Sequence, residues 1–541
     1  MANENTNTSS KYDDITSKSL IQSGSPTRYQ LKLKDENIGN LKRMTLGEKN
    51  PKKTNKTILL VGETGAGKST LINALVNYAM GVEWEDDVWF EIVKEEKKSQ
   101  SKSQTSDVIV YQIFGFEDKT LPYSLTIIDT PGYGSTAGIE QDAIVSQRLF
   151  DLFRSVDGVH EMNAVGLVLR ASENRLSDRL RYIFDSVASL FGKDMEMNIV
   201  ALITHSDGVT PEDALQALED AEIKCAKNEE NEPLHFMFNN RQRKQKTKKN
   251  QVALKNAWDI TMDQMRQFTD FLENASPQNL ITTVEVLKSR IRLTAYIQNL
   301  QERIELIELK QKEIQQTKEG LKNHEQEMNS NKMFTVEVEE VYKDKEPING
   351  GMWWLVFFKG AVCCKVCEEN CHFPGCTVAW KPEYCEVMKD GRCTVCTGKC
   401  PVSDHVKENW KFVNKTKKVK KTKEDMKEKY EKCQTDCQEK TSLLENLQKK
   451  MEELQKEKDQ LLEKSFKHVV KLDEIALNVN ALSTYVHLDI LIDKMKEKGD
   501  TDKVKKLMEL KSRVDEGTTT GVRSMFSKLR AAGSAVTAYI K

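Results

Sequence analysis

Residues 62–69, with the sequence GETGAGKS, contain every fixed position of a phosphate-binding loop. An apolar run, 58–61, precedes the loop and a helix-forming run, 70–79, follows it, as such a loop requires. Its glycines let backbone N–H groups point at phosphates, while the Lys68 ammonium neutralises the β- and γ-phosphates and the Ser69 hydroxyl binds Mg²⁺. The sequence therefore predicts a nucleoside triphosphate site, with contacts from Gly62, Glu63, Thr64, Gly65, Ala66, Gly67, Lys68, Ser69 and Thr70.

Two further segments predict how Mg²⁺ and the γ-phosphate are sensed. Asp129 follows the apolar run 125–128 and opens the sequence Asp-Thr-Pro-Gly, which ends at Gly132. We expect Asp129 to hold the metal through water and the Gly132 N–H to contact the γ-phosphate. Alone this segment would be a simple turn after a strand, but its place after the phosphate loop favours the sensing role. Thr105, ahead of the run 108–114, is the candidate Mg²⁺-binding hydroxyl of the first switch, with Ser106 as the alternative.

A third segment bears on which base is bound. The sequence Thr204-His205-Ser206-Asp207 ends the apolar run 199–203, where guanine-specific folds place Asn-Lys-x-Asp. A carboxylate at Asp207 can accept hydrogen bonds from N1 and N2 of guanine, whereas adenine offers no such pair of donors on that edge. The sequence therefore favours guanine over adenine. The missing Asn and Lys keep an ATP-dependent enzyme as an alternative.

These segments require a scaffold that brings them together. Short apolar runs alternate with helical stretches, which indicates a buried, mostly parallel sheet with helices on both faces. The predicted fold class is thus an α/β P-loop domain over residues 51–275, preceded by a polar tail, 1–50, with one short strand near 29–33. The apolar runs lie at 58–61, 108–114, 125–128, 165–169, 199–203 and 234–238.

Nine of the twelve cysteines lie between Cys363 and Cys400. Two half-sites with a shared Cys-x2-Cys-x3-Cys pattern occur there, and paired thiolates at this spacing present their sulfurs to one ion. The simplest assignment is one structural zinc held by Cys364, Cys367, Cys393 and Cys396; the remaining cysteines and two histidines could complete a second site. The alternative is a set of buried thiols without metal. The candidate zinc ligands are Cys364, Cys367, Cys371, His372, Cys393, Cys396, Cys400 and His405.

Heptad-like apolar spacings before and after the cysteine module predict two long helices, 276–332 and 423–480. Their similar lengths favour an antiparallel coiled-coil hairpin that carries the small β and cysteine-rich module, 333–422, at its tip. The alternative is two coiled coils that dimerise between chains. Alternating residues at 334–342 and 410–413 predict a β-ribbon at the base of the module. The final segment, 481–541, reads as an amphipathic helical region that packs back on the body.

The 541 residues carry a formal net charge of −1 and no uninterrupted apolar stretch of membrane-spanning length. This balance gives no global field for nucleic acid, so we expect no nucleic-acid partner and a cytoplasmic location. The basic runs 241–249 and 415–423 read as solvated faces, with phosphate or lipid headgroups as the alternative. The apolar run 352–358 and the C-terminal helix leave contact with a membrane surface or a protein effector open.

The chain resembles the immunity-associated GTPases, which are close to the plant avirulence-induced GTPases and related to septins. The resemblance covers about 55–250 and rests on the phosphate loop, residues 129–132, 157–169 and 204–207, and the Phe-Asn-Asn-Arg sequence at 238–241. It implies that Asn239 and Asn240 line the guanine pocket together with Thr204, His205 and Asp207. A stretch between Gly158 and Gly192 is similar to a box peculiar to this family and ranks it above the septins.

The residue after Gly132 is Tyr133, where fast small GTPases carry the Gln that orients the attacking water, so we expect slow intrinsic turnover of GTP. The resemblance implies self-association of the GTPase domain, with an arginine supplied across the interface; Arg175 aligns best with it, and otherwise is a solvated residue at a helix start. The leading hypothesis is a guanine-nucleotide switch, dependent on Mg²⁺, that forms homo-oligomers and acts as an immune-type scaffold. A septin-like filament protein with little turnover is the alternative.

Overall fold

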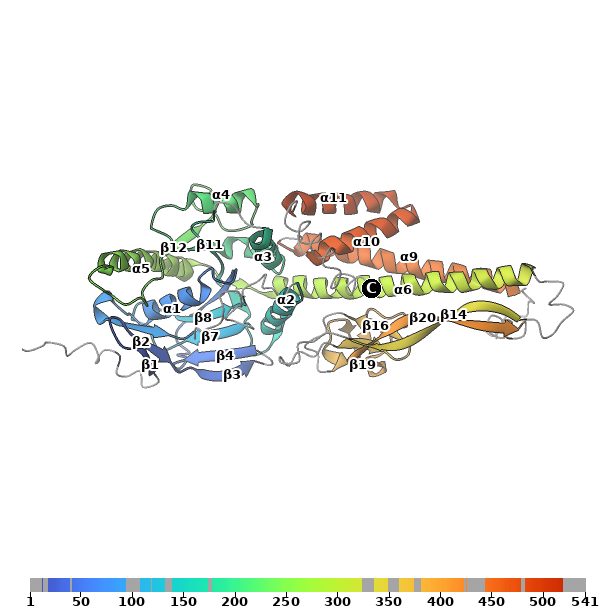
Figure 1. Ribbon diagram of the computed structural model, residues 1–541, viewed down its shortest axis with the longest axis horizontal. Helices are drawn as coiled ribbons and strands as arrows, with labels where there is room; N and C mark the ends of the chain where they lie inside the picture. Colours follow the sequence, from blue (N-terminus) through green and yellow to red (C-terminus); the bar gives the residue numbers. More distant parts are fainter. Residues whose placement is uncertain are drawn as a thin grey trace, which may run out of the picture. The chain divides into compact units, whose positions relative to one another are not determined.

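The computed structural model describes residues 12, 18–38, 41–93, 108–117, 119–131, 139–173, 178–323, 335–348, 360–373, 381–422, 425, 443–477 and 482–518. The chain divides into two compact units. Unit 1 comprises residues 1–287, 475–484 and 513–541, and unit 2 comprises 288–474 and 485–512. The phosphate loop therefore belongs to unit 1 and the cysteine module to unit 2; the elements of both are labelled in Figure 1.

An eight-stranded sheet with the order β12-β11-β10-β5-β8-β7-β4-β3 forms the centre of unit 1 (Figure 1). Neighbouring strands from β12 to β8 are parallel, β7 is antiparallel to β8, and β3 is antiparallel to β4. The predicted mostly parallel sheet is confirmed, and each of the six apolar runs lies on one of its strands. The strands are β3 (Lys34–Ile38), β4 (Leu41–Leu46), β5 (Asn55–Gly62), β7 (Ile109–Ile113), β8 (Ser124–Asp129), β10 (Ala164–Arg170), β11 (Ile199–Thr204) and β12 (His235–Phe238).

Helices α1 (Lys68–Ala79) and α5 (Gln251–Asn274) share one hydrophobic core with this sheet. Leu71 and Ile72 of α1 and Phe268 of α5 are buried in it together with Ile58 and Leu60 of β5. Because β5 is apolar on both faces, it can only lie inside the sheet, and this fixes the phosphate loop at its end. The other helices of unit 1 include α2 (Ile139–Arg154), α3 (Asp178–Ala188) and α4 (Glu212–Asp220).

Residues 18–46, expected to belong to a polar tail with one short strand, form four strands. β1 (Lys18–Gln22) pairs with β2 (Thr27–Leu31), which pairs with β6 (Val88–Glu91), while β3 and β4 extend the central sheet. Their side chains are mostly polar, but the apolar residues Leu31, Ile38, Leu41 and Leu46 are buried. β1 has no buried apolar residue, β2 and β3 have one each and β4 has two, which is too weak a pattern to read as strands from sequence. Neighbouring strands supply the missing stabilisation.

Two long helices run antiparallel in unit 2. α6 (Ile281–Asn323) begins in unit 1 and continues into unit 2, and α9 (Leu443–Ile475) pairs with it. The direction follows from three contacts. The ring of Tyr296 stacks on His468 at 4.6 Å, Arg303 pairs with Glu457, and Lys318 donates to Gln448 at 3.0 Å. Sequence numbers rise along α6 while those of the partners fall along α9, as in a helical hairpin.

Two further helices, α10 (Leu482–Lys498) and α11 (Thr501–Thr518), follow α9. Lys494 of α10 pairs with Glu308 of α6 at 3.8 Å, and Lys503 of α11 pairs with Glu463 of α9 at 2.6 Å. This part of the predicted C-terminal helical region therefore packs on the helical hairpin. The apolar run 352–358 and the C-terminal positions beyond 518 lie outside the described residues.

A β-ribbon links the helices to the cysteine module, as the alternating residues predict. β14 (Thr335–Pro347) pairs antiparallel with β20 (Trp410–Thr422) over their whole length. The ribbon packs along α6, where Glu339 N–H donates to Gln316 at 2.9 Å and Asn414 Nδ2 donates to the Glu302 carbonyl at 3.0 Å. Contacts with α6 therefore move towards its N-terminal half as the ribbon approaches the cysteine module.

The cysteine module is therefore not at the tip of the hairpin, and the prediction of a terminal tip is wrong. The Tyr296 hydroxyl donates to the Thr394 carbonyl at 2.7 Å, and Arg292 donates to the Glu386 carbonyl at 3.1 Å. Polar contacts hold the ribbon along α6, among them the pair of Lys312 and Glu339 at 2.7 Å. In Figure 1 the ribbon lies beside α6 and the module beside the N-terminal half of that helix.

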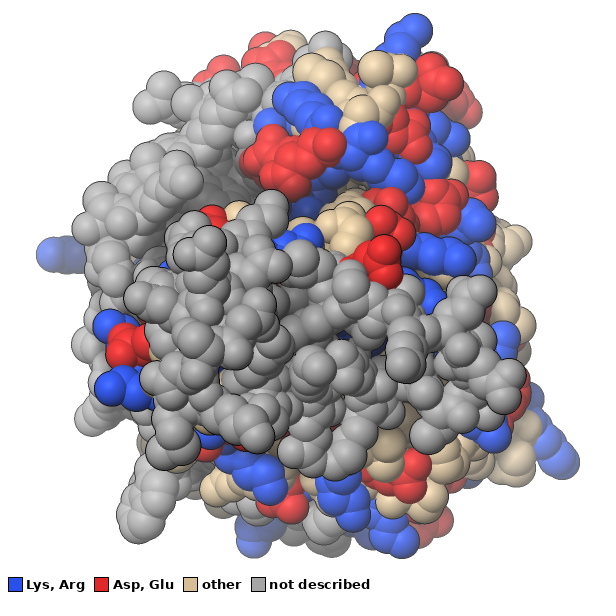
Figure 2. All heavy atoms as spheres, turned by 90° about the vertical axis from the view of Figure 1, so that its right-hand side faces the viewer, with Lys and Arg blue, Asp and Glu red and all other residues tan. Residues whose placement is uncertain are grey.

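The basic run 415–423 pairs with acidic residues, and Lys417, Lys418 and Lys420 remain exposed, as expected of a solvated face. Lys415 pairs with Asp344 at 2.8 Å, and Lys421, which is buried, pairs with Glu313 at 3.2 Å and Glu340 at 2.8 Å. On the described part of the face seen in Figure 2, Lys and Arg side chains are likewise mixed with Asp and Glu. Within the described residues, no helix combines the length and the apolar character needed to span a membrane.

Candidate nucleotide site and cysteine cluster

The phosphate loop connects β5 to the first residue of α1. Gly65 and Gly67 adopt φ values of 85° and 100°, which residues with a side chain rarely adopt. At Gly62, an added Cβ would lie 2.3 Å from the Val168 carbonyl oxygen, so only glycine fits beside β10. The N–H groups at the start of α1 are left to bind an anion, because no side chain caps this helix.

Lys68 is the charged centre of the loop. Its side chain is only 7% exposed, and its ammonium donates to the carbonyls of Gly62 at 2.7 Å and Glu63 at 3.1 Å. Burial lowers the pKa of Lys68 to about 8, and the nearby carboxylates of Asp129 and Glu63 oppose that shift. Phosphate oxygens would take the place of the carbonyls as acceptors and favour the protonated form.

The predicted nucleotide-binding segments meet at one edge of the sheet. Gly62, Asp129 and Thr204 are the last residues of β5, β8 and β11, which run parallel, so their carboxyl ends lie side by side. Asp129 is fully buried. Ligands of open α/β sheets bind at this edge. The structure thus brings together the phosphate loop, the Asp129 segment and the Thr204 segment.

Two contacts around the loop were not foreseen. The Thr204 hydroxyl donates to the Ala66 carbonyl at 2.6 Å, which ties the end of β11 to the phosphate loop. Arg170, the last residue of β10, donates from Nη2 to the Gly65 carbonyl at 3.0 Å. Its position at the carboxyl end of a central parallel strand was the one signal in the sequence that could have identified it.

The base side of the site is formed by β11 and β12. Thr204 pairs with Phe238, so the segments beginning at His205 and Asn239 leave the sheet next to each other. Asp207 is exposed and its Oδ1 accepts from the Val209 N–H at 3.1 Å, which fixes the loop. His205 has a φ of 58° and an exposed ring, and partial burial with the charges of Arg170 and Arg241 lowers its pKa.

Asn240 follows β12, next to the Thr204 segment, and its side-chain amide is unsatisfied. Both polar atoms of its side-chain amide, Oδ1 and Nδ2, are buried and make no hydrogen bond with the described residues. A buried amide normally satisfies both atoms, because an unmade hydrogen bond costs about 1–3 kcal/mol. A purine edge with its own donors and acceptors would satisfy both. Asn239 lies beside it, with its N–H donating to Thr261 at 3.0 Å.

The residues present fit a nucleotide with Mg²⁺. Ser69 and Thr70 open α1 and are partly exposed, as ligands for a metal and a phosphate must be. The other catalytic candidates, Thr105, Gly132 and Arg175, lie outside the described residues, as do Ser106 and Tyr133.

The cysteine module is built on a three-stranded sheet, β16-β15-β19. β15 (Ala361–Cys364) pairs with β16 (Glu369–His372) on one side and β19 (His405–Glu408) on the other. Cys364 lies directly opposite His405 in this register. Because side chains alternate along a strand, Cys363 faces the opposite side, where it packs with Phe412. Burial raises the pKa of the Cys363 thiol to about 12.

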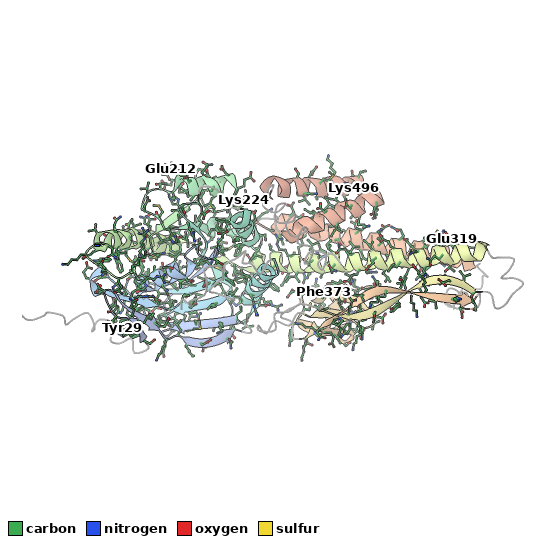
Figure 3. All side chains as sticks on the ribbon, in the orientation of Figure 1. Tyr29, Glu212, Lys224, Glu319, Phe373 and Lys496 are labelled. Carbon is green, nitrogen blue, oxygen red and sulfur yellow. The ribbon has the colours of Figure 1, made fainter. Side chains whose placement is uncertain are left out.

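That opposite face has its own small apolar cluster. Phe373 follows β16 and is labelled in Figure 3, and it packs with Cys363 and Phe412. The Lys411 ammonium lies 4.9 Å from the centre of the Phe373 ring. The two faces of β15 therefore separate a dry apolar side from the side that carries the metal-ligand candidates.

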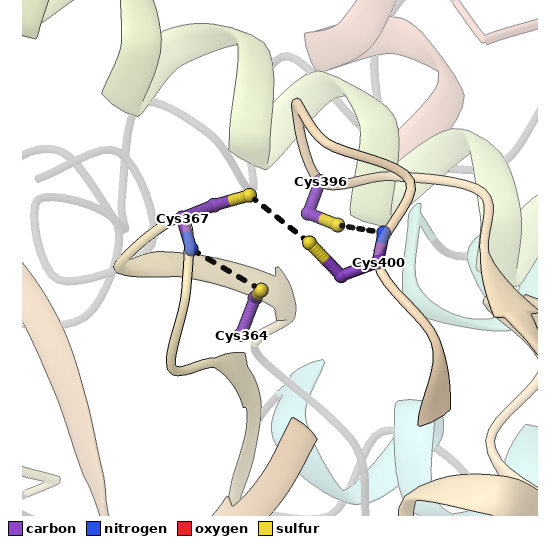
Figure 4. A group of neighbouring side chains, drawn as sticks. All are labelled: Cys364, Cys367, Cys396 and Cys400. Atoms are coloured by element: carbon purple, nitrogen blue, oxygen red, sulfur yellow. Dashed lines mark hydrogen bonds between the residues drawn. The ribbon is translucent and has the colours of Figure 1, made fainter. Parts of the chain in front are cut away.

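Two groups of four side chains have ligand atoms within 4.8 Å of one another. The first is Cys364, Cys367, Cys396 and Cys400, and the second is Cys371, Cys393, Cys396 and His405. Figure 4 shows the first group, in which the sulfurs of Cys367 and Cys400 are 3.6 Å apart. A tetrahedron with Zn–S bonds of about 2.3 Å has S–S edges of about 3.8 Å, so the spacing fits zinc.

The grouping differs from the simplest sequence assignment in two respects. Cys400, not Cys393, completes the set with Cys364, Cys367 and Cys396. His372 is outside both groups, and its Nδ1 faces the Cys385 sulfur at 3.1 Å. Spacing within a half-site predicts which cysteines form a knuckle, but the partner of each knuckle is set by the fold of the chain between them.

Backbone N–H groups point at the sulfurs. The N–H of Cys367 donates to Cys364, that of Gly398 donates to Cys367, and that of Cys400 donates to Cys396, each at 3.3 Å. Such donors stabilise thiolates, which are the form that binds metal. At Gly398 an added Cβ would lie 2.9 Å from the Cys400 sulfur, so this turn also requires glycine.

Comparison with known proteins finds a family model that matches part of unit 1. Residues 56–255 match the model of the AIG1 family, and this range includes both the phosphate loop and the base-side segments. These residues are therefore similar to the AIG1 family, and their strand order is that of a P-loop GTPase fold. The predicted resemblance is confirmed for these residues.

Similar solved structures include Toc33 from Arabidopsis thaliana with Mg²⁺ and GMPPNP, at 19% identity over 42% of this chain and 88% of that chain, with a TM-score of 0.29. Toc33 from the same plant with GDP and Mg²⁺ is 16% identical over 41% of this chain and 87% of that chain, with a TM-score of 0.29. A third structure comes from work on the chloroplast translocon components atToc33 and psToc159, for whose GTPase activity dimerization is important. Its chain is 20% identical over 41% of this chain and 85% of that chain, with a TM-score of 0.29. No curated protein matches the sequence. These scores are low, so the assignment of the fold rests on strand order and the family match.

Proposed function

We propose that unit 1 binds GTP or GDP with Mg²⁺ and acts as a guanine-nucleotide switch that hydrolyses GTP slowly. The observation that carries the proposal is the unsatisfied, buried amide of Asn240 at the same sheet edge as the Lys68 loop. The phosphate loop supports triphosphate binding by itself. The Asp207 carboxylate follows β11, two strands from β5 and its phosphate loop. Together with the Asn240 amide, it supports binding of a purine that has hydrogen-bond donors on its Watson–Crick edge.

In this proposal each residue has a defined task. The N–H groups of residues 63–70 and the Lys68 ammonium hold the phosphates, Ser69 and Asp129 hold Mg²⁺, and Asp207 and Asn240 read the base. Bound Mg²⁺ neutralises charge that develops on the phosphates during hydrolysis. Thr204 and Arg170 keep the loop in its binding conformation through the Ala66 and Gly65 carbonyls.

Slow turnover and self-association complete the proposal. Tyr133 replaces the glutamine that orients water in fast GTPases, and Arg175 of a neighbouring copy would supply the missing positive charge. A homo-oligomer assembled in the GTP state would then act as a scaffold, in immune defence by the family resemblance. A protein effector and a cytoplasmic location belong to the same proposal, the latter supported by a thiol-rich module suited to a reducing compartment.

We also propose that the cysteine module binds structural zinc. The two groups of four ligand atoms and the N–H donors to their sulfurs support it. All candidate ligands come from the protein, so the metal would have no open position for catalysis.

Nucleotide binding is tested by substituting Lys68 in the full chain. We expect Lys68→Ala to weaken Mg²⁺-GTP binding by at least about 100-fold, because the variant loses charge-assisted hydrogen bonds to the phosphates. Calorimetry measures the affinity, and Lys52→Ala, at an exposed lysine before β5, serves as the control. An unchanged affinity for GTP in Lys68→Ala would contradict the proposed site.

Base specificity is tested by Asp207→Asn. We expect this variant to lose about 10- to 100-fold in GTP affinity, since a hydrogen bond to a charged group contributes about 1.5–3 kcal/mol. It should gain affinity for xanthosine triphosphate, because the asparagine amide can donate to the C2 carbonyl of xanthine and accept from N1. Asp213→Asn, at an exposed position on α4, is the matched control. Equal binding of ATP and GTP by the wild type would favour the ATP-dependent alternative.

A septin-like structural protein with bound but scarcely hydrolysed nucleotide is the second candidate, favoured by the long helical pair of unit 2. The rate of GTP hydrolysis per chain distinguishes the two. Assembly-activated hydrolysis must rise with protein concentration, whereas the structural candidate predicts a low, constant rate.

A further inference from the structure

We propose that the cysteine module holds two zinc ions that share the Cys396 thiolate as a bridging ligand. This inference rests on the zinc binding proposed above and is independent of the nucleotide site. It specifies how many ions are bound, which residues hold each ion, and which single side chain couples them.

The number of donors is the first argument. Two tetrahedral zinc ions need eight ligand positions, and the two groups together contain seven different side chains, because Cys396 belongs to both. Seven side chains therefore fill all eight positions if one sulfur binds both ions. A thiolate can do this, since its sulfur has several lone pairs, whereas a histidine nitrogen has only one to give.

The position of Cys396 is the second argument. It lies in the middle of its half-site, between Cys393 on β18 (Arg392–Cys393) and Cys400, and these two neighbours belong to different groups. Its side chain is completely buried, so both ions can approach it only from within the module. The Cys400 N–H donates to its sulfur at 3.3 Å, which fixes the thiolate between the two groups.

His405 is oriented as a ligand of the second ion. Its Nδ1 lies 2.9 Å from the Pro401 carbonyl, and a hydrogen bond there places the proton on Nδ1. The other nitrogen, Nε2, is buried and makes no hydrogen bond with the described residues. A lone pair held in this way, next to thiolates, is what a zinc ligand requires.

The neighbouring candidates are occupied elsewhere. Cys363 lies on the other face of β15, where its sulfur is 3.3 Å from Asn370 Oδ1. Cys385 faces His372 and belongs to neither group. Among the described cysteines of the module, the six that belong to the two groups are therefore the ones directed at the proposed ions.

A second layer of contacts holds the half-site that contains Cys396. The carboxylate of Glu369, 7% exposed, accepts from the Thr397 N–H at 3.0 Å and from Asn299 of α6 at 3.3 Å. The Lys399 ammonium donates to the Val395 carbonyl at 2.9 Å. Six thiolates and two zinc ions leave a negative cluster, and the Lys399 charge beside it offsets part of this.

Zinc content of the purified full chain, measured by mass spectrometry in reducing buffer, is the first test. We expect about two ions per chain in the wild type and about one in Cys364→Ser and in Cys371→Ser, each of which removes a ligand from one ion only. Cys363→Ala, a buried cysteine of the same module outside both groups, should keep about two. One ion per wild-type chain would overturn the binuclear cluster alone, and none would overturn zinc binding as well.

The bridge is tested by Cys396→Ser and by cobalt. We expect Cys396→Ser to release both ions to a chelator that leaves one ion in each single-ligand variant. Release of only one ion would overturn the bridge. With Co²⁺ in place of zinc, the electron paramagnetic resonance signal of the first equivalent should weaken as the second binds, because a shared sulfur couples the two spins. Two additive signals would contradict a shared ligand. Because this measurement uses the wild-type chain, it does not depend on the folding of any variant.

Discussion

At the scale of single residues, Lys68 shows how burial prepares a group for its ligand. The loop pattern predicted its role, but its environment could not be read from the sequence, because the two carbonyls that hold the ammonium belong to a fold-dependent turn. The same limit applies to Arg170 and Thr204, whose contacts with the loop depend on strand order. Patterns of adjacent residues were predictable, whereas contacts between strand ends were not.

The lowered pKa of Lys68 predicts how nucleotide affinity changes with pH. The free protein loses this proton near pH 8, while phosphate oxygens favour the ammonium and raise its pKa in the complex. Binding therefore takes up a proton above about pH 8, and the affinity for Mg²⁺-GTP should fall by up to about tenfold per pH unit there.

Calorimetry in buffers of different ionisation enthalpy measures this proton uptake. Lys68→Arg is the control, because a guanidinium remains protonated throughout and its variant should lose the pH dependence. If Lys68→Arg keeps the same slope, the proton belongs to another group.

At the scale of elements, the sequence predicted which segments pair better than where the pairs lie. The ribbon of β14 and β20 was expected from alternation, yet its course along α6 depends on side chains such as Lys312 and Glu339, which pair at 2.7 Å. Heptad spacing predicted the helices. Charged residues on their surfaces, however, do not show in the sequence which element they will pair with. The cysteine knuckles follow the same rule, since Cys396 and Cys400 meet Cys364 and Cys367 only through the intervening fold.

The turn at Gly398 gives a prediction at this scale. An added methyl group would lie 2.9 Å from the Cys400 sulfur and 3.3 Å from the Cys367 sulfur, so both ligands of the first ion must move. We expect Gly398→Ala to weaken one of the two zinc sites by roughly 10- to 100-fold, in the range seen when the surroundings of metal ligands are altered.

Competition with a chromophoric chelator measures the two affinities separately. Gly391→Ala is the control: its φ of 75° makes alanine costly for the backbone, but nothing lies within 4 Å of the added Cβ. Equal loss of zinc in both variants would mean that a general disturbance of the module, not crowding of the sulfurs, is responsible.

At the scale of the whole molecule, the two units depend on different sources of stability. Unit 1 has a large apolar core built from its sheet, α1 and α5. The core cluster around the cysteine module is small, and six of its eleven buried residues are cysteines. A core of this kind buries little apolar area, so the proposed zinc ions would supply much of the free energy that keeps the module folded.

This difference predicts two separable thermal transitions. Removing zinc with a chelator in reducing buffer should lower the unfolding temperature of unit 2 and leave that of unit 1 unchanged. Mg²⁺-GTP at about 100 times its dissociation constant should stabilise unit 1 by about 2.7 kcal/mol and raise only its transition, while ATP at the same concentration should not. Differential scanning calorimetry resolves both shifts in one chain. A single transition that responds equally to chelator and to GTP would show that the nucleotide domain and the cysteine module unfold as one cooperative unit. That outcome would contradict separate sources of stability for the two units.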